Sequence, residues 1–533
     1  MVPLKVSPHA TYVAHLEKGE LAYQWSRTAN RAVFFPRLVC PFTGSTDLEW
    51  RIATGKGTVY STTTVHSVDG NAYNVALIDC DEGFRLMSRV EDIAPDAVTV
   101  GMRVSFKVHR PGGEAEPIPV FTPLADESAA PAASGQTARG PAISRRNSAG
   151  HARRGSAAIV GVAESDIGQV AAELTPIDLM AQGITRALDD CGMKLSDVDG
   201  LFCATTQART SALSLSEYLG IDAPFIGSTI VGGSSFEYHV AQAQQAIEAG
   251  LCSVAVIAYG STQRSVGRRQ ASAREVNPYE TPFKPFLPAS AYAIAARRHM
   301  HQYGTTREQL AAVAVAARQW AQLNPVAWDR RPLTIEDVLS ARPISTPFTV
   351  RDCCLSTDGG GAIVVTSAER ARSLKKAPAY VLGCGQSISH AAISSMPDLT
   401  LTGARRSGEV AYAMAGLGPK DIDVLALYDA FTINTILFLE DLGFCPKGEG
   451  GRFVEGGRIA PKGSLAVNTN GGGLSYCHPG MYGLFLLIEA VRQIRGECGE
   501  RQVAGATTAL AHGNGGVLSS QATVILGSEA TLS

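Results

Sequence analysis

The sequence predicts a small all-β barrel followed by a larger, internally duplicated α/β fold. Three observations support this division. Short β-branched runs fill the first 124 residues, a segment without core-forming residues follows at 125–155, and strands alternate with helices from residue 156 onward. A chain of 533 residues is also too long for one hydrophobic core. We therefore expect two folded parts, residues 1–124 and 156–533, joined by a tether.

The first part contains four or five short candidate strands. Alternating or β-branched runs are separated by glycine, aspartate and proline, which favour turns. The runs are GKGTVYSTTTVH (55–66), YNVALIDCD (73–81), FRLMSRV (84–90) and RVSFKVHR (103–110). Strands of this number and length predict a closed or partly open barrel.

The tether at 125–155 differs in composition from both neighbours. It has no aromatic residue, no acidic residue after Glu127, and five arginines between Arg139 and Arg154. Such a segment cannot bury a core and is expected to stay solvated.

The second part alternates apolar strands with amphipathic helices. SAAIVGVAES (156–165) is a strand candidate, PIDLMAQGITRALDDCG (176–192) a helix and VDGLFCAT (198–205) another strand. PAYVLGCGQS (378–387) resembles the first of these segments and opens a second series of the same kind. This alternation predicts a parallel or mixed sheet with both faces covered, built from two similar halves.

Composition argues against several classes of protein. The net charge of −2 gives no reason to expect a nucleic-acid partner. The sequence has no run of 18 apolar residues, so no membrane span is expected. The first twenty residues lack an apolar signal segment, so we expect a cytoplasmic protein. Apolar residues at 45% and charged residues at 18% are typical of globular chains. The eleven scattered cysteines do not predict a disulfide framework.

Several glycine-rich segments resemble the thiolase superfamily, and most closely its sterol-carrier-protein-X and lipid-transfer branch. They occur in the same order as in that family. The matching segments are TIVGGSSFEYHVAQAQQAIEAG (229–250), DCCLSTDGGGAIVVTS (352–367), LYDAFTINTILFLEDLGF (427–444), NTNGGGLSYCHPGMYG (468–483) and AHGNGGVLSSQ (511–521). The resemblance implies a layered αβαβα fold over 156–533, an acyl-CoA thioester as substrate, and a homodimer.

The thiolase nucleophile is missing from the first of these segments. Thiolases place a reactive cysteine at a turn that opens a buried helix, where the helix N-terminus stabilises thiolate. Here Gly233 stands at that position and is followed by Ser234. Glycine cannot form an acyl-enzyme. We interpret Gly233 as a residue that the turn requires, with a serine capping the helix.

The remaining segments provide groups for proton transfer and oxyanion binding. By resemblance, Tyr428 replaces one thiolase histidine, His478 keeps another, and His512 replaces the second cysteine. Phenol and imidazole groups exchange protons and stabilise oxyanions. Backbone and amide donors for a thioester or enolate oxygen are expected nearby, at Gly472, Gly473, Asn514 and Gly515.

These groups fit a retro-aldol cleavage of a β-hydroxyacyl-CoA, which needs a base and enolate-stabilising donors but no acyl-enzyme. Two alternatives remain at this point. One is a thiolase-type acyltransferase with a relocated nucleophile, Cys477 or Ser234. The other is a non-catalytic carrier of acyl-CoA or lipid. In each case coenzyme A enters only as part of the bound molecule.

The N-terminal part resembles acyl-CoA-associated domains that combine a rubredoxin-like zinc ribbon with an OB-fold. That family binds zinc through two Cys-x-x-Cys pairs. Only Cys40 remains, because Thr43 stands in place of its mate and Ser26 and Ala29 occupy the first pair. One thiolate does not make a tetrahedral zinc site, so no zinc is expected. The resemblance implies that the barrel completes or covers the acyl-CoA site.

Overall fold

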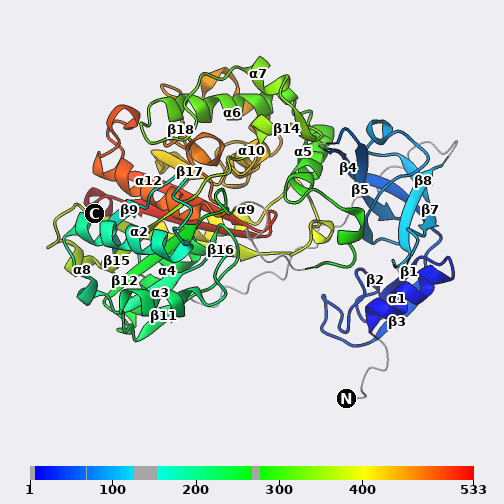
Figure 1. Cartoon of the computed structure of the whole chain (residues 1–533), viewed down its shortest axis with the longest axis horizontal. Coiled ribbons are helices and arrows are strands. Elements are labelled where there is room, and N and C mark those ends of the chain that lie inside the picture. The colour runs from blue at the N-terminus through cyan, green and yellow to red at the C-terminus, as the bar shows by residue number, and fades with distance from the viewer. Residues whose placement is uncertain (1–6, 68, 114, 125–152, 267–275) are drawn as a thin grey trace.

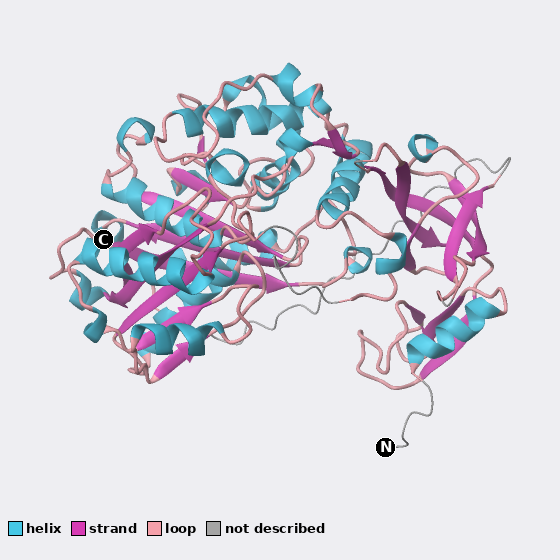
Figure 2. Cartoon of the chain, viewed as in Figure 1, coloured by secondary structure: helices cyan, strands magenta, loops and turns pink. Residues whose placement is uncertain are grey.

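The computed structural model describes residues 7–67, 69–113, 115–124, 153–266 and 276–533 (Figure 1). A β-rich N-terminal part lies beside a larger layered α/β part, and the two differ plainly in helix content (Figure 2). The predicted tether falls almost wholly on residues 125–152, which lie outside the described residues. No helix in the described part of the chain is long and apolar enough to cross a membrane.

The chain begins with helix α1 (Pro8–Glu17), which Ser7 caps by accepting a hydrogen bond from the backbone N–H of Ala10. The helix packs on a small antiparallel sheet in the order β2-β1-β3. Its strands are β1 (Ala22–Ser26), β2 (Arg31–Val33) and β3 (Leu48–Ile52). Tyr12 and Leu16 on α1 and Tyr23 on β1 belong to a core shared with the barrel.

The barrel is built from the predicted strands and one more. Its strands are β4 (Lys56–His66), β5 (Ala72–Cys80), β6 (Arg85–Ser88), β7 (Arg103–His109) and β8 (Ile118–Pro123). Strand β4 pairs with β5 along its length and with β7 at its start, and a bulge between Val59 and Ser61 bends it. A bridge between Val90 and Phe121 connects the end of β6 to β8. The sequence does not predict β8 (IPVFTP), because its two prolines are unfavourable in strands.

The larger part extends the sheet of the barrel. Hairpin strands β13 (Pro343–Ser345) and β14 (Phe348–Thr349) join β4, with Ser345 opposite Val65. The backbone N–H of Thr346 donates to the carbonyl of Thr64 at 2.9 Å. The Tyr60 ring of the barrel lies between the guanidinium groups of Arg85 and Arg298. The two parts are thus joined by backbone pairing as well as by side chains.

The α/β part contains one ten-stranded sheet made of two halves with the same strand order. In each half the strands lie in the order third, second, fourth, fifth, first, counted along the chain. The first half comprises β9 (Ala157–Glu164), β10 (Gly200–Cys203), β11 (Phe225–Gly227), β12 (Val254–Ser261) and β15 (Gly359–Ser367). The second comprises β16 (Ala379–Ile388), β17 (Val424–Leu427), β18 (Ala466–Val467), β19 (Thr508–Gly515) and β20 (Ser520–Gly527). Strands β9 and β16 meet at the centre, so the predicted duplication is confirmed.

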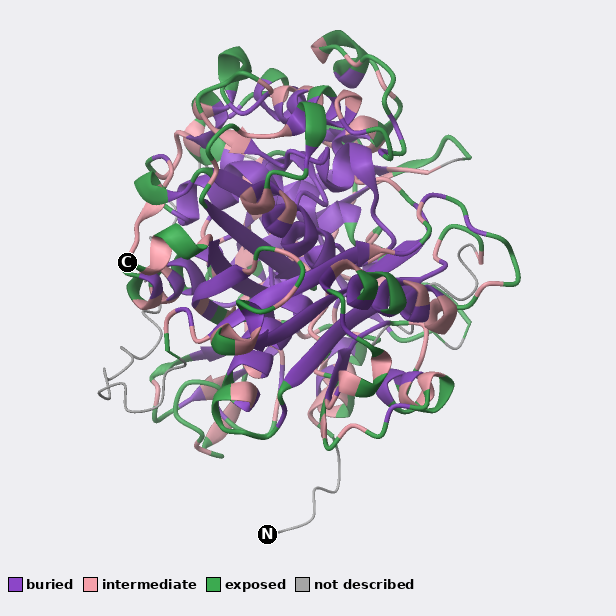
Figure 3. Cartoon of the chain, turned by 90° about the vertical axis from the view of Figure 1, so that its left-hand side faces the viewer, coloured by how far each residue is buried: buried purple, intermediate pink, exposed green. Residues whose placement is uncertain are grey.

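The helices form three layers around these strands. Helices α4 (Ser235–Glu248) and α12 (Gly483–Arg495) contact strands of both halves and form the middle layer. Most of their residues are buried, as expected for helices covered on all sides (Figure 3). Helices α2 (Pro176–Cys191) and α3 (Ser211–Leu219) cover the first half, and α9 (Ala404–Ala415) and α10 (Thr432–Asp441) cover the second. The predicted αβαβα layering is therefore confirmed.

The remaining helices lie mostly in the long connections of each half. They are α5 (Ala289–Tyr303), α6 (Arg307–Gln322), α7 (Ile335–Leu339), α8 (Ala368–Ala371) and α11 (Gly450–Phe453). Helix α5 packs against β4 and so connects the barrel to the layered part.

Candidate active site

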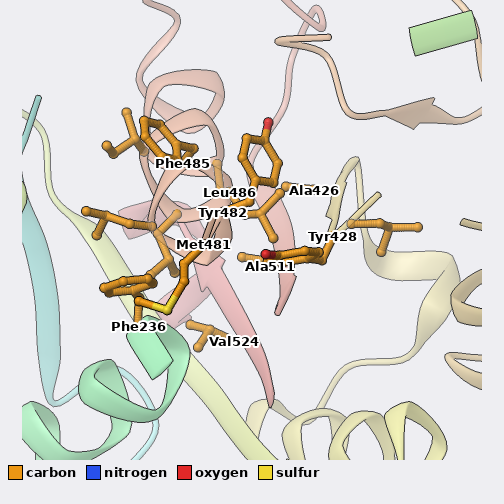
Figure 4. Close-up of a cluster of buried hydrophobic side chains, with 14 of the residues drawn as sticks. Phe236, Ala426, Tyr428, Met481, Tyr482, Phe485, Leu486, Ala511 and Val524 are labelled. Carbon is orange, nitrogen blue, oxygen red and sulfur yellow. The ribbon is translucent and has the colours of Figure 1, made fainter. Parts of the chain in front are cut away.

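Tyr428 and His478 form a hydrogen-bonded pair in the interior. Tyr428 follows β17, and His478 comes just after a π-helical turn at Gly472–Tyr476. The Tyr428 hydroxyl lies 3.1 Å from Nε2 of His478. The imidazole stacks on Tyr482, and the backbone N–H of His478 donates to the Thr357 hydroxyl at 3.0 Å. Figure 4 shows the Tyr428 and Tyr482 rings among the surrounding apolar side chains.

Burial keeps both members of this pair neutral at pH 7. It raises the pKa of Tyr428 well above 10, and it lowers the pKa of His478 to about 4. In the tautomer with the proton on Nδ1, Nε2 of the neutral imidazole accepts the hydrogen bond of the phenol. The pair can therefore pass a proton between a substrate hydroxyl and the imidazole.

The phenol of Tyr428 occupies the space that a side chain at residue 233 would need. A Cβ built on Gly233 would lie 2.5 Å from Cζ and 2.5 Å from the hydroxyl oxygen of Tyr428. Real Cβ atoms do not approach other atoms so closely. The absence of a nucleophile at residue 233 is thus coupled to the presence of tyrosine at 428.

The turn before α4 differs from the sequence interpretation. The left-handed backbone conformation belongs to Gly232, with φ of 82°, and not to Gly233. The Ser234 side chain makes no capping hydrogen bond. Instead the Ser235 hydroxyl donates to the carbonyl of Gly232 at 2.6 Å and accepts from the N–H of Val231. Gly233 is required by the approach of Tyr428 and not by the turn.

His512 lies on the opposite face of the sheet from Tyr428. Strand β17 runs parallel to β19 with Leu427 opposite His512, so the next residue, Tyr428, points the other way. Both ring nitrogens of His512 are hydrogen-bonded, Nδ1 to Thr523 and Nε2 to Gln521, each at 2.9 Å. Burial lowers its pKa to about 3. The structure therefore does not bring His512 to the Tyr428–His478 pair.

Ala511 and Gly513 are the residues of this segment that face the middle layer. Ala511 lies beside Tyr428 in Figure 4, and a Cβ on Gly513 would collide with Oε2 of Glu237 on α4. The predicted site residue, His512, is thus one residue away from those that face the middle layer, and a shift of one residue moves a side chain to the other face of a strand.

The expected oxyanion donors are engaged within the protein. The N–H of Gly472 donates to the Asn470 side chain at 2.9 Å, and that of Gly473 donates to Oδ1 of Asp429 at 2.6 Å. The Asn514 amide donates to the Tyr292 hydroxyl at 2.7 Å, on the same face as His512. Gly515 packs closely against the carbonyl of Val231. The hydrogen bonds of Gly472, Gly473 and Asn514 to protein groups hold the loops in shape.

Two buried carboxyl groups near the pair were missed at the sequence level. Burial raises the pKa of Asp429 to about 7 and that of Glu237 to about 8. Neither oxygen of Glu237, nor Oδ2 of Asp429, has a hydrogen-bond partner among the described residues. The signal for Glu237 was an acidic residue in the first turn of an otherwise buried helix.

The two alternative nucleophiles lack an activating base. The Ser234 hydroxyl is buried and bonded to the Ser520 hydroxyl at 2.9 Å. Cys477 is fully buried, and burial raises the pKa of its thiol well above 9. Nucleophilic attack requires an adjacent base or a lowered pKa. The geometry therefore gives neither residue the properties of a nucleophile.

The residues at the positions where zinc ribbons carry cysteines do not fit a metal ion. The Cys40 thiol accepts hydrogen bonds from the Ser26 and Thr43 hydroxyls, which together with backbone N–H groups lower its pKa to about 7. One thiolate and two hydroxyl groups do not provide a tetrahedral zinc site. Across the residues that the structure describes, no three His, Cys, Asp or Glu side chains are grouped as metal ligands.

Comparison with known proteins defines the class. Residues 385–528 match the family described as thiolase C-terminal domain-like, and residues 50–109 match the ChsH2 C-terminal OB-fold domain. The chain is 35% identical to a steroid side-chain-cleaving aldolase of Thermomonospora curvata, over 64% of this chain and 91% of that protein. The chain therefore belongs to the thiolase superfamily, joined to an OB-fold domain.

Two further proteins narrow the comparison. A 17-hydroxy-3-oxo-4-pregnene-20-carboxyl-CoA lyase of Mycobacterium tuberculosis is 35% identical over 64% of this chain and 92% of its own. The solved structure of an Ltp2-ChsH2(DUF35) aldolase superposes with a TM-score of 0.65 and 33% identity, covering 71% of this chain and 99% of that one. The chain thus lies close to aldolase-type thiolase relatives.

Proposed function

We propose that this protein is a carbon–carbon lyase that cleaves a β-hydroxyacyl-CoA by a retro-aldol reaction. The products are a shortened acyl-CoA and an aldehyde or ketone. The observation that carries this proposal is the Tyr428 phenol, which fills the place of a nucleophile at Gly233 and bonds to a neutral His478. The names of the two curated relatives, an aldolase and a CoA lyase, support the same reaction class.

The pair accounts for the first proton transfer. The β-hydroxyl proton passes to the oxygen of Tyr428 while the phenol proton passes to Nε2 of His478. The Cα–Cβ bond then breaks, its electron pair enters the thioester as an enolate, and the β-carbon becomes a carbonyl. His478 holds this proton only transiently, because burial disfavours the imidazolium, and its positive charge offsets the negative charge that develops as the bond breaks. No acyl-enzyme is required, since the acyl group leaves still attached to coenzyme A.

The reaction is tested by offering β-hydroxyacyl-CoA and β-ketoacyl-CoA substrates with and without free CoA. We expect cleavage of β-hydroxyacyl-CoA without free CoA, with an acyl-CoA and a carbonyl product identified by mass spectrometry. A steroid acyl group is the first to offer, because the names of both relatives refer to steroids. Turnover is expected to survive Cys477→Ala. Dependence on free CoA together with a trapped acyl-enzyme would overturn the proposal in favour of acyl transfer.

We also propose that the protein is a homodimer formed through strand β11. Among the strands that the structure describes, β11 lies at the edge of the ten-stranded sheet and pairs with β10 alone. Ile226 on β11 and the neighbouring Leu213, Tyr218 and Ile230 are exposed apolar residues. An edge strand with an apolar surround favours pairing with a second copy. Light scattering is expected to give twice the chain mass of 56.1 kDa, and Ile226→Lys to reduce it to one chain, whereas Ile52→Lys, at an exposed isoleucine of the separate N-terminal sheet, retains the dimer.

Three further proposals concern the domain boundaries, the cofactors and the location of the protein. We propose a division into an OB-fold domain at 1–124, a tether at 125–155 and a thiolase-like domain at 156–533. We propose that the protein retains no zinc and no cofactor, and that coenzyme A enters with the substrate. A cytoplasmic location fits eleven cysteines that are all free thiols.

A further inference from the structure

Glu237 is a buried carboxylic acid without a hydrogen-bond partner, four residues after Gly233 in the chain. It lies in the first turn of α4 and is 1% exposed. Neither carboxyl oxygen has a hydrogen-bond partner among the described residues. Gly233 precedes α4, and a Cβ built on Gly483 would lie 2.2 Å from the Gly233 carbonyl oxygen and 2.5 Å from Oε2 of Glu237, so the Glu237 carboxyl lies close to the backbone of Gly233.

Two further glycines leave room for this carboxyl group. A Cβ on Gly483, the first residue of α12, would lie 2.5 and 2.8 Å from the two carboxyl oxygens. A Cβ on Gly513 of β19 would collide with one of them. The carboxyl therefore lies among the loop before α4, the start of α12 and the middle-layer face of β19.

A purely structural residue at this position would not need to be an acid. A buried polar group without a partner costs stability, and Gln, Met or Leu would fill the same volume. Burial raises the pKa of Glu237 to about 8, so the group is largely protonated at pH 7 and holds a transferable proton. Perturbed carboxyl groups of this kind are typical of sites of proton transfer.

The other titratable groups near the pair are placed for different tasks. Tyr428 and His478 are committed to each other, and Oδ1 of Asp429 is held by the N–H of Gly473. His512 lies on the far face of β19, and Ala511, which replaces it on the near face, has no proton to give. Asp429 keeps only Oδ2 without a partner, whereas Glu237 has neither carboxyl oxygen engaged among the described residues.

We propose that Glu237 supplies the proton taken up by the α-carbon after carbon–carbon cleavage, an inference that rests on the proposed retro-aldol function. The enolate electron pair forms a new C–H bond with the carboxyl proton, and the carboxylate remains. The proton that His478 received from the substrate hydroxyl then returns to Glu237 through solvent. The net reaction consumes no water and no oxidant, because the hydroxyl proton ends on the α-carbon.

The test measures exchange of the α-protons of propionyl-CoA and acetyl-CoA in D₂O, followed by NMR and mass spectrometry. The wild-type chain is expected to exchange the α-protons of at least one of these two probe thioesters. Glu237→Gln keeps the shape of the side chain but not the acid, and is expected to slow the exchange by about 100-fold. Its kcat for cleavage is expected to fall with little change in KM, while its melting temperature stays within a few degrees of wild type.

A matched control removes a buried acid elsewhere. Glu280 is buried, its pKa is raised by burial, and it accepts a hydrogen bond from the Ser394 hydroxyl at 2.6 Å. Glu280→Gln is expected to exchange at the wild-type rate. If Glu237→Gln does not fold, Glu237→Met provides the same comparison without a polar group.

The outcomes separate the inference from the proposed function. Cleavage by wild type combined with undiminished exchange in the folded Glu237 variants overturns the role of Glu237 and leaves the lyase intact. A wild-type chain that cleaves no β-hydroxyacyl-CoA overturns both. Equal loss of exchange in the Glu280 variant overturns the inference as well, because the effect would then not depend on position.

Discussion

Replacing Tyr428 by phenylalanine is expected to lower kcat for carbon–carbon cleavage by about 1,000-fold, with little change in KM. The substitution removes only the hydroxyl that lies 3.1 Å from Nε2 of His478. Without it the substrate hydroxyl has no acceptor and the imidazole receives no proton. The ring itself remains packed against Gly233, so binding and folding are expected to persist. Steady-state kinetics with a β-hydroxyacyl-CoA measures both parameters.

Two control variants make this result specific. Tyr412 donates a hydrogen bond to the carbonyl of Leu442 at 3.2 Å, far from the site, and Tyr412→Phe is expected to change kcat less than about twofold. His512→Gln is expected to lower stability without a large loss of kcat, because His512 faces away from the pair. A Tyr428→Phe variant with wild-type kcat, or a His512→Gln variant that is inactive yet stable, would contradict the assignment.

Adding a single methyl group at Gly233 is expected to lower kcat by about 100-fold or more, because it displaces the phenol from its position. The new Cβ would lie 2.5 Å from the hydroxyl oxygen of Tyr428. The same crowding is expected to reduce the free energy of unfolding by about 1–3 kcal/mol. Urea unfolding and kinetics of Gly233→Ala measure the two effects.

A double-mutant cycle tests the cause of this loss. In a Tyr428→Ala background, Gly233→Ala is expected to change the free energy of unfolding by less than about 0.5 kcal/mol, because the ring is gone. Gly418→Ala serves as the matched control substitution. The φ of Gly418 is −136°, and a Cβ there would meet no atom closer than 3.8 Å. Equal costs of Gly233→Ala in both backgrounds would show that Tyr428 is not what Gly233 accommodates.

The close contact between Gly233 and Tyr428 also prevents a cysteine at residue 233 from acting as a nucleophile. A cysteine at residue 233 would meet the Tyr428 ring before its sulfur could reach a thioester. Acyl transfer would therefore require a smaller side chain at 428 together with Gly233→Cys. The glycine at residue 233 and the phenol at residue 428 therefore depend on each other, because a side chain at 233 would collide with the ring.

The sequence by itself determined the architecture and the class of chemistry. Alternation of period two marked the strands β4 to β7, because their inward side chains alternate with outward ones. Amphipathic helices between apolar strands marked the two halves, and both open with the expected strands, β9 and β16. The absence of a cysteine at Gly233 and the presence of Tyr428 and His478 were likewise visible in the chain.

Only the tertiary structure decided which side chains meet. The sequence resemblance predicts His512 in the site, whereas strand pairing puts Ala511 and Gly513 on that face. The reason for Gly233 lies in a ring that follows it by nearly 200 residues, and no local pattern records such a contact. Glu237 looked like an ordinary polar residue of a helix. Its significance appears only when α12 and β19 close around it, because burial and the absence of a partner depend on segments far apart in the sequence.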